Sequence, residues 1–543
     1  MSDTTFSRRG KALLKRPALY GVALATLCPA ALAHAAPARP APKPASIDAR
    51  CTALVGRAGF GANVVITNAK HVAAGPMAAE PGAPPAAPIT LPAHCRVEGV
   101  INQRTGFGGK AYGIGFALAL PDVWTGRFLT QGGGGLNGMV RAPIGGAAAG
   151  RTPALLRGFA VVSHDSGHKG AVFDAAFMAD QRANLDFSET SVRVVTEAAK
   201  AITAAYYAKP IAHSYMAGCS TGGRESMLAF QRYPELFDGV VVGAPAMRTG
   251  NSNLAMQHAA VQFNQAAPRD ASGAPQFDRI FSDLDRKTIL NGLLEQCDGL
   301  DGRKDGMIMH VAGCRFSPAK LICAPGQTAN CITQAQSDAI DRAFQPPRDR
   351  AGNALYSRYP FDTGITFTGR GIPGFLSSGR LNPVGPPTNT LSIDVDARIA
   401  AIRADAGQRL TDTDVWTNLS TFLGHSGKVL FYHGVSDPWF SAFDTWDYWQ
   451  RAAVANGAAF TDASRFYMVP GMGHCGGGDA FDSFDLLGAV VDWVEKGAAP
   501  DAVIASRSTG GDEQRPLCPY PAYAHYLGGN PALAASYACR KAE

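Results

Sequence analysis

A serine stands among glycines in the segment Gly218-Cys219-Ser220-Thr221-Gly222, which fits the pattern G-x-S-x-G. Where a strand turns sharply into a helix, this pattern raises the serine hydroxyl above the edge of a sheet. Glycines are needed there because neighbouring backbones approach closely. The N–H of Thr221 would open that helix and face an oxyanion formed beside Ser220. The segment therefore predicts a nucleophilic serine with one backbone donor beside it.

A serine hydroxyl is a weak nucleophile at neutral pH unless a general base lies within hydrogen-bond reach and a third group orients that base. Two downstream loops supply candidates. Asp437 follows a late apolar run, and His474 stands in the glycine-dense stretch Val469–Gly478. The order serine, aspartate, histidine is that of α/β hydrolases, so we expect Ser220 as nucleophile, His474 as general base and Asp437 as its orienting acid. The alternative for Asp437 is a residue that only caps a turn.

The cysteines give a separate argument for this site. The chain has 11 of them, and loss of Cys28 with an export signal would leave ten. An even set in an exported chain argues for disulfides, and the lack of a C-x-x-C pair argues against a zinc site. Short spacings suggest Cys51 with Cys95, Cys297 with Cys314, Cys323 with Cys331 and Cys518 with Cys539, which leaves Cys219 and Cys475. A bond between these last two would hold Ser220 beside His474 and constrain the unfolded chain by about 5 kcal/mol.

Alternating strands and helices must position these residues. Short apolar runs predict buried strands, and longer periodic stretches predict helices. The expected elements are a strand over Arg157–Ser163, a helix over Ser188–Ala205, a strand over Ile211–Ala217, a helix that ends at Arg232, a strand over Asp238–Ala244 and a strand over Lys428–His433. Such alternation implies a mostly parallel sheet with helices on both faces.

The alternation stops over residues 247–424, which are rich in Gly, Pro and Asp. We therefore expect an α/β-hydrolase core made of residues 51–246 and 425–543, with a large inserted lid domain between the two parts. An insertion at this place usually covers the site and contacts the substrate. Its aromatic and basic residues, including Phe375, Arg380 and Trp416, are candidate substrate contacts.

Residues 1–35 are typical of an export signal, because basic residues precede the apolar stretch Ala18–Leu32 and a small-residue cleavage site. That stretch is too short and too Ala-rich for a stable membrane anchor. Residues 36–50 are rich in Pro and Ala and predict a flexible leader. We expect a secreted or periplasmic protein.

The composition is that of a globular chain: 543 residues, 46% of them hydrophobic, with a formal net charge of +6. Beyond the N-terminus no dense run of Lys and Arg occurs, so nucleic acid is not expected as a partner.

The chain resembles the tannase and feruloyl esterase family from about Cys51 to Cys539. The shared pattern joins Cys-Ser at the nucleophile, a late Asp, and His-Cys at the base. Further similar stretches are Asp165-Ser166-Gly167-His168, Gly222-Gly223-Arg224-Glu225 and Phe237–Ala246. His164, Asp165 and His168 stand close together, but after a strand they are better explained as a polar turn than as a metal site.

The resemblance implies an α/β hydrolase with a lid that cleaves esters of aromatic carboxylic acids. It also implies a glycine-rich oxyanion loop, matched by Gln131–Gly138, in which Gly132 or Gly133 would be the second donor and Gly132 is slightly favoured. A flexible surface loop is the alternative. No organic cofactor is implied, and the expected partner is a small aromatic ester.

A short acidic loop in the insertion, Cys297–Ile308, carries three aspartates among glycines. Hard oxygen ligands suit calcium, but the spacing excludes an EF-hand. The loop resembles the family's structural calcium site in the lid, which would use the side chains of Asp298, Asp301 and Asp305 and the carbonyls of Arg303 and Met307. A solvated turn is the alternative.

Together these features predict a serine esterase of the feruloyl type, which acts on hydroxycinnamic-type esters through an acyl-enzyme. Gallate esters, as for a tannase, and mono(2-hydroxyethyl) terephthalate are alternative substrates. A serine peptidase would not account for Cys219 and Cys475. From another class, a catalytically silent, calcium-bound binding protein on the same fold is the rival.

Overall fold

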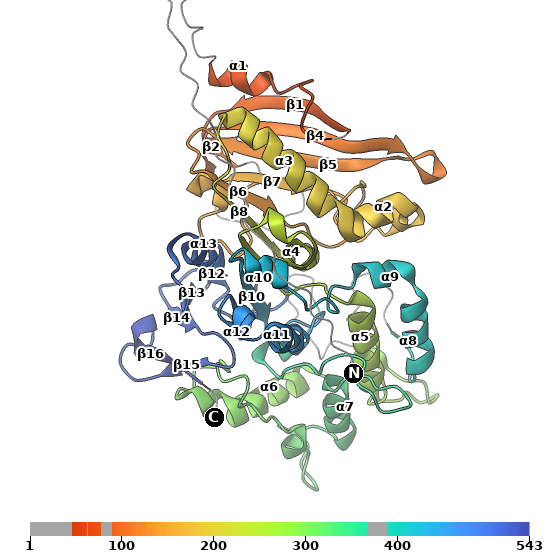
Figure 1. The fold of residues 1–543 in the computed structure, drawn as a ribbon. Helices are drawn as coiled ribbons and strands as arrows, with labels where there is room; N and C mark the ends of the chain where they lie inside the picture. The colour runs from red at the N-terminus through yellow and green to blue at the C-terminus, as the bar shows by residue number, and fades with distance from the viewer. Residues whose placement is uncertain (1–45, 62, 78–88, 367–387, 542–543) are drawn as a thin grey trace, which may run out of the picture. The chain divides into compact units, whose positions relative to one another are not determined.

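The computed structural model describes residues 46–61, 63–77, 89–366 and 388–541 (Figure 1). A nine-stranded sheet runs through them in the order β1-β4-β5-β7-β6-β8-β9-β10-β11. The six strands from β7 to β11 in this order are parallel, and β1, β4 and β5 are antiparallel. This confirms the expected mostly parallel α/β core. The strands are β1 (Val64–Val72), β4 (His94–Thr105), β5 (Ala111–Pro121), β6 (Arg127–Gln131), β7 (Ala160–His164), β8 (His213–Cys219), β9 (Gly239–Gly243), β10 (Lys428–Gly434) and β11 (Ser464–Val469).

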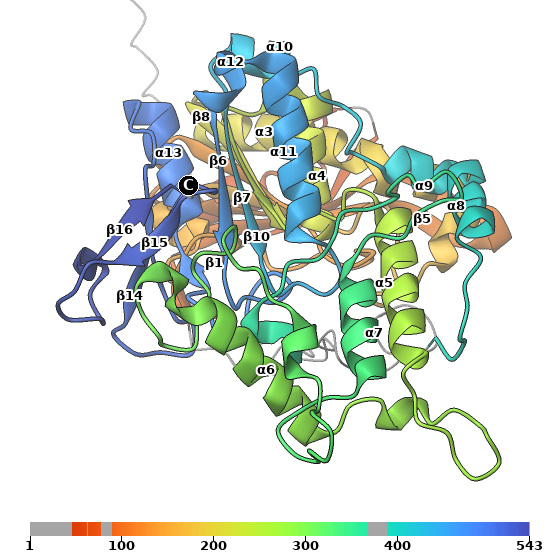
Figure 2. The same ribbon diagram turned by 90° about the horizontal axis from the view of Figure 1, so that it is seen from below.

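The central strands are buried on both faces, which is why they consist of continuous apolar runs. Successive side chains alternate, so Val240 and Val242 pack on one face and Val241 on the other. Helices α3 (Ser191–Tyr207), α4 (Thr221–Arg232) and α11 (Ala442–Asn456) cover the first face, and α13 (Leu486–Lys496) covers the second (Figure 2). Full burial of each such side chain contributes about 1.5–3 kcal/mol.

The expected insertion lies between β9 and β10, which are neighbours in the sheet. Two of its helices begin with a capping box, Ser282 with Asp285 and Thr333 with Gln336. The helices of the insertion are α5 (Thr249–Asn264), α6 (Asp283–Cys297), α7 (Gln334–Phe344), α8 (Val395–Ala404), α9 (Ala406–Thr411) and α10 (Ser420–Gly424). Helices α5, α6 and α7 pack on an apolar cluster of their own that includes Phe263, Ile289 and Ile340. Helix α8 packs against Leu254 of α5 in a second cluster, and α10 adds Phe422 to the core.

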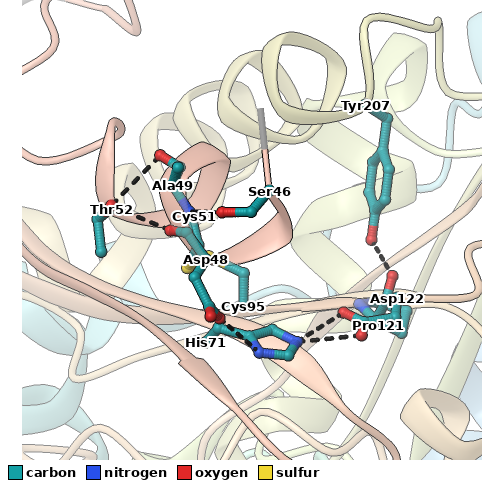
Figure 3. The surroundings of a disulfide bond; sticks show 10 residues. All are labelled: Ser46, Asp48, Ala49, Cys51, Thr52, His71, Cys95, Pro121, Asp122 and Tyr207. Atoms are coloured by element: carbon teal, nitrogen blue, oxygen red, sulfur yellow. Dashed lines mark hydrogen bonds and ion pairs between the residues drawn. A yellow bond between two sulfur atoms is a disulfide. The ribbon is translucent and has the colours of Figure 1, made fainter. Parts of the chain in front are cut away.

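The N-terminal end of the described chain is fastened to the sheet (Figure 3). Helix α1 (Ile47–Thr52) starts at Ser46, whose hydroxyl accepts the Ala49 N–H at 3.1 Å. A disulfide joins Cys51 to Cys95 of β4. The expectation of a flexible leader over 36–50 is therefore wrong at its C-terminal end. The expected export signal and the rest of the leader lie outside the described residues.

His71 of β1 strengthens this attachment. Its Nδ1 lies 3.0 Å from Asp48 of α1 and its Nε2 lies 3.0 Å from Asp122, so one imidazole bridges two carboxylates (Figure 3).

Three element boundaries differ from the sequence expectation by a few residues. The strand expected over Arg157–Ser163 begins at Ala160, because a 3-10 turn ends at Gly158 in the left-handed region (φ 78°). The helix expected from Ser188 begins at Ser191, after a wider π turn over Asp186–Thr190. The strand expected over Ile211–Ala217 runs from His213 to Cys219.

Smaller elements complete the description. Two small sheets in the C-terminal part were not expected from the sequence. The remaining elements are β2 (Gly75–Pro76), β3 (Thr90–Leu91), α2 (Gln181–Leu185), α12 (Ala458–Thr461), β12 (Ser483–Phe484), β13 (Val503–Ser506), β14 (Gln514–Leu517), β15 (Tyr523–Tyr526) and β16 (Tyr537–Arg540). Among the described helices, none has the length and apolar character needed to cross a membrane.

Candidate active site

Ser220 occupies the turn between β8 and α4 with φ 65° and ψ −123°. A side chain other than glycine rarely adopts this conformation, which costs roughly 1–3 kcal/mol and is typical of functional turns. The turn is tight because Gly132 packs directly on it: a Cβ added at Gly132 would lie 2.6 Å from the Cα of Gly222. The half-buried Ser220 thus stands at the start of a helix, as a nucleophile requires.

Asp437 and His474 come together behind this turn. His474 Nδ1 lies 2.6 Å from Asp437 Oδ2, and both residues are buried. The other oxygen, Oδ1, accepts the N–H groups of Trp439 (2.9 Å) and Phe440 (3.2 Å). With Nδ1 donating to Asp437, the Nε2 lone pair is free, and this buried atom has no hydrogen-bond partner among the described residues. This is the state that a general base needs.

A disulfide between Cys219 and Cys475 connects the two halves of the site. Its Cα atoms are 5.9 Å apart, and the two cysteines are 256 residues apart in the sequence. Because Cys219 precedes Ser220 and Cys475 follows His474, the bond keeps the predicted nucleophile and base in one neighbourhood. The other disulfides join the pairs suggested by short spacing: Cys51–Cys95, Cys297–Cys314, Cys323–Cys331 and Cys518–Cys539.

His433 is a second histidine on the same carboxylate, and no motif in the sequence predicts this role. Its Nε2 lies 3.3 Å from Asp437 Oδ2 and 3.0 Å from the carbonyl of Phe440. Burial by itself would raise the pKa of Asp437, but the charge interaction with His474 and the hydrogen bonds from His433 and His474 hold that pKa below its ordinary range. Asp437 is therefore a carboxylate at neutral pH.

A cavity of about 700 Å³ opens above Ser220 and Thr221. Its walls are mainly apolar and aromatic, and come from the core and from the insertion. The large apolar side chains in the lining are Leu136, Phe173, Met178, Phe187, Met256, Trp439 and Phe440. Trp439 and Phe440 also contact the His474 ring, with centroids 4.8 and 5.2 Å away. The cavity can therefore hold an aromatic group next to the predicted base.

Of the insertion residues expected to contact substrate, Trp416 is not in this lining. It is 52% exposed, and its indole N–H donates to the carbonyl of Asn418. Phe375 and Arg380 lie outside the described residues. Polar groups that do line the cavity include Asn184, Asn253 and Gln408.

In the glycine-rich loop, the backbone N–H expected to bind the oxyanion is already hydrogen-bonded. The Gly132 N–H donates to the carbonyl of Ala217 at 3.0 Å and so extends the pairing of β6 with β8. In this structure the Gly132 N–H is therefore not free to bind an oxyanion, contrary to the expectation. The alternative donor, the Gly133 N–H, is bonded to Glu225 Oε2 at 2.8 Å. Thr221, the first residue of α4, has no intrahelical acceptor for its N–H, and its role as an oxyanion donor stays a prediction.

Glu225 orders this loop from inside the protein. Besides the Gly133 N–H, its carboxylate accepts the Asn137 side-chain amide at 2.9 Å and the Ser166 hydroxyl at 3.1 Å, and it is 1% exposed. The Thr221 hydroxyl also donates to the carbonyl of Gly135. The loop is thus attached to α4 at two places. Glu225 lies in a stretch shared with the family, but nothing in the sequence indicated its partners.

The acidic loop folds as a short 3-10 turn, Asp298–Asp301, followed by a bend. The carboxylate of Asp298 accepts the N–H groups of Asp305 and Gly306 at 3.1 and 3.0 Å. Asp301 accepts those of Arg303 and Met309 at 3.0 and 3.3 Å. No group of three His, Cys, Asp or Glu side chains in the described part of the chain is arranged to hold a metal ion.

Two observations on this loop nevertheless fit a cation. Burial and the charges of Asp305 and Asp298 raise the pKa of Asp301 to about 7. Asp305 Oδ1 is buried without a hydrogen-bond partner, although its other oxygen lies 3.1 Å from Arg515 and 3.4 Å from Arg303. The loop therefore brings together more carboxylate oxygens than its hydrogen bonds and these two arginines satisfy.

Comparison with known proteins adds an independent finding. A family model described as tannase and feruloyl esterase matches residues 95–374 and 381–540. Mono(2-hydroxyethyl) terephthalate hydrolase of Piscinibacter sakaiensis is 36% identical over 525 residues, which cover 84% of this chain and 87% of the relative. A probable feruloyl esterase B-2 of Neosartorya fischeri is 30% identical over 465 residues, with coverages of 80% and 84%. The crystal structure of feruloyl esterase B from Aspergillus oryzae superposes with a TM-score of 0.71 at 26% identity, covering 91% of this chain and 100% of that one.

Proposed function

The chain belongs to the tannase and feruloyl esterase family, and from this we propose that it is a secreted serine carboxylic ester hydrolase for esters of aromatic, hydroxycinnamic-type acids. The observation that carries the proposal is the pair Asp437–His474, 2.6 Å apart, with a free Nε2 that the Cys219–Cys475 bond keeps near Ser220. A silent binding protein would not need an oriented base.

The proposed reaction proceeds through an acyl-enzyme. His474 Nε2 takes the Ser220 proton as Ser220 Oγ attacks the ester carbonyl, and the Thr221 N–H stabilises the oxyanion. The alcohol leaves with the proton from His474. Water, deprotonated by His474, then attacks the acyl carbon; the bond to Ser220 Oγ breaks, His474 returns the proton to that oxygen, and the acid is released. Asp437 keeps the imidazole oriented and stabilises its cation throughout.

The cavity supports an aromatic acyl group. Phe173, Trp439 and Phe440 give flat apolar surfaces that stack on a substituted phenyl ring, and amide side chains such as Asn253 can bond ring hydroxyl groups. A feruloyl ester is therefore the first choice. The 36% identity to a mono(2-hydroxyethyl) terephthalate hydrolase makes that monoester the second candidate, and gallate esters are the third.

Export of the enzyme is proposed from two features together. The five disulfides require an oxidising compartment, and residues 1–35 have the composition of a signal.

Calcium is the proposed structural ion of the acidic loop. Asp298, Asp301 and Asp305 with the carbonyls of Arg303 and Met307 would hold it, and no described group donates a hydrogen bond to these two carbonyls. A bound cation would neutralise the carboxylates and so order the insertion.

Hydrolysis of methyl ferulate, mono(2-hydroxyethyl) terephthalate and methyl gallate by the purified protein tests the function, with Ser220→Ala as the control. Turnover that depends on Ser220 is expected, with ferulate ranked first. A different ranking would correct the substrate. No turnover of any of them, with calcium present and disulfides intact, would favour the binding protein.

A further inference from the structure

Asp362 is a buried carboxylate of the insertion that contacts both turns behind the catalytic pair. It is 2% exposed and lies just before a short 3-10 turn, Thr363–Thr366. Its Oδ2 accepts the hydroxyl of Ser436 at 2.6 Å and the N–H of Gly471 at 2.7 Å. Ser436 immediately precedes Asp437, and Gly471 lies three residues before His474. One oxygen atom therefore connects the acid turn, residues 434–439, to the base turn, residues 469–475.

The surroundings of Asp362 indicate that packing alone does not account for it. Its second oxygen, Oδ1, is buried without a hydrogen-bond partner, and no described arginine, lysine or histidine forms an ion pair with it. Burial raises its pKa to about 6, although the Ser436 hydroxyl and the N–H groups of Gly471 and Thr363 favour the charged form. A buried carboxylate with an unsatisfied oxygen is unfavourable for folding. The contribution of Asp362 must therefore lie in how its hydrogen bonds arrange the acid turn and the base turn.

That geometry is specific. The Ser436 hydroxyl donates to Asp362 and accepts the Gly364 N–H at 2.9 Å, so the serine is held from two sides. The acid and base turns also touch directly: the Val435 N–H donates to the Val469 carbonyl and the Ser436 N–H to the Met472 carbonyl, each at 3.0 Å. Asp362 adds a connection through side-chain atoms, which fixes the rotation of one turn against the other. The Asp437–His474 bond depends on both turns.

We propose that Asp362 is a positioning residue for this reaction: it holds the acid turn and the base turn in the register that keeps His474 aligned on Asp437. The proposal rests on the proposed function only through the roles of Asp437 and His474. Asp362 does not line the cavity above Ser220, so it positions the base without touching substrate.

Three variants separate positioning from stability. Asp362→Ala removes both bonds, Ser436→Ala removes one, and Asp362→Asn keeps an acceptor for both donors while its NH₂ takes the place of the unpartnered Oδ1. For Asp362→Ala we expect kcat to fall about 10- to 100-fold with KM within about twofold, since a misplacement of about 1 Å costs on that order. Ser436→Ala should lie between the alanine variant and the wild type. Asp362→Asn should keep most of kcat, and at neutral pH it should unfold no earlier than wild type, because the amide removes a buried charge.

Two readouts are needed on the same samples, purified as full chains with disulfides intact. Steady-state hydrolysis of the best ester gives kcat and KM. The rate of inactivation by phenylmethylsulfonyl fluoride reports the reactivity of Ser220 whatever the natural ester is, and should fall in parallel with kcat. Asp412→Ala is the matched control, because Asp412 is a half-buried acid of the insertion, also with an unpartnered oxygen, that contacts neither turn.

The outcomes are distinct. Folded Asp362→Ala with unchanged kcat and inactivation rate overturns the proposal, as does an equal loss of kcat in Asp362→Asn and Asp362→Ala. If Asp362→Ala does not fold, the asparagine and Ser436→Ala variants decide alone. A wild type that hydrolyses no ester but reacts with the sulfonyl fluoride corrects the substrate and leaves the Asp362 test intact. A wild type inert to both rejects the triad and Asp362 with it.

Discussion

His433 Nε2 lies 3.3 Å from Asp437 Oδ2, the same oxygen that accepts the 2.6 Å hydrogen bond from His474. His433 is itself fixed, because its Nδ1 lies 2.9 Å from the Thr445 hydroxyl and its Nε2 lies 3.0 Å from the Phe440 carbonyl. This leaves Nε2 as the N–H donor. The carboxylate is thus oriented by a group that never meets the substrate.

Replacing His433 should therefore weaken catalysis without weakening substrate binding. For His433→Leu we expect kcat to fall on the order of tenfold at unchanged KM, because Asp437 loses a charge-assisted hydrogen bond. Thr445→Val, which removes only the partner of Nδ1, is the control and should have a smaller effect. Full kcat in a folded leucine variant would mean that His474 and the N–H groups of Trp439 and Phe440 orient Asp437 by themselves.

The Cys219–Cys475 bond should affect activity as well as stability. Cys475 is exposed, and the double variant Cys219→Ser/Cys475→Ser frees the two halves of the site from each other. We expect both a lower Tm and a lower kcat, since the proposed nucleophile and base would no longer be held together. Cys518→Ser/Cys539→Ser, which opens a bond with a sequence separation of only 21, should lower Tm alone. Equal kcat values for the two double variants would contradict the catalytic role.

Asp165 should make the protein less stable as the pH rises. Burial raises its pKa to about 7, although the N–H groups of Gly167 and Gly115 bond its carboxylate at 3.0 and 2.9 Å. The ordinary value is about 4, so between about pH 4 and 7 the folded chain binds more protons than the unfolded chain. Stability from this group is then full below pH 4 and is lost as the pH rises to 7.

Thermal unfolding of wild type and Asp165→Asn from pH 4 to 8 measures this effect. Asparagine keeps an acceptor for both N–H groups and carries no charge, so its Tm relative to wild type should rise with pH and level off above about 7. Other titrating groups are common to both proteins, so their effects cancel in the difference between the two Tm values. A difference in Tm that does not change with pH would assign the effect to packing.

Removal of calcium should destabilise the insertion before it affects chemistry. A chelator is expected to lower Tm, and Asp298→Asn should abolish the difference between chelated and calcium-loaded protein. Asp283→Asn, at a fully exposed acid on α6, is the matched control and should keep that difference. At 25 °C, kcat of the chelated enzyme should stay close to that of the loaded enzyme. No shift in Tm with calcium would show that the arginines near Asp305 suffice.

The sequence was most informative where function depends on a few adjacent residues. The order Ser220, Asp437, His474 and the cysteines beside two of them follow from linear motifs, and the structure brings Asp437 and His474 into contact. The occupied N–H of Gly132 could not be predicted, because it depends on the register of β6 with β8. The role of Asp362 could not be predicted from the sequence either, since its hydrogen-bond partners lie far along the chain.

The structure of the insertion could not be predicted from the sequence either. Its irregular pattern predicted an interruption of the core but not the helices that pack on Phe263 and Ile340. The expected flexible leader is too long at its C-terminal end, because Ser46 caps α1 in a stretch whose composition alone predicts a flexible chain.

The fastened N-terminal end described above has a practical consequence for using the enzyme on solid supports. In the sheet, four strands separate β1 from β8, which at about 4.8 Å per step puts that edge roughly 24 Å from the strand that carries Ser220. A linker joined ahead of Ser46 would pull on a helix that a disulfide ties to β4, and not on the catalytic turns. Immobilisation through this end should therefore leave the cavity open to polymeric or particulate esters.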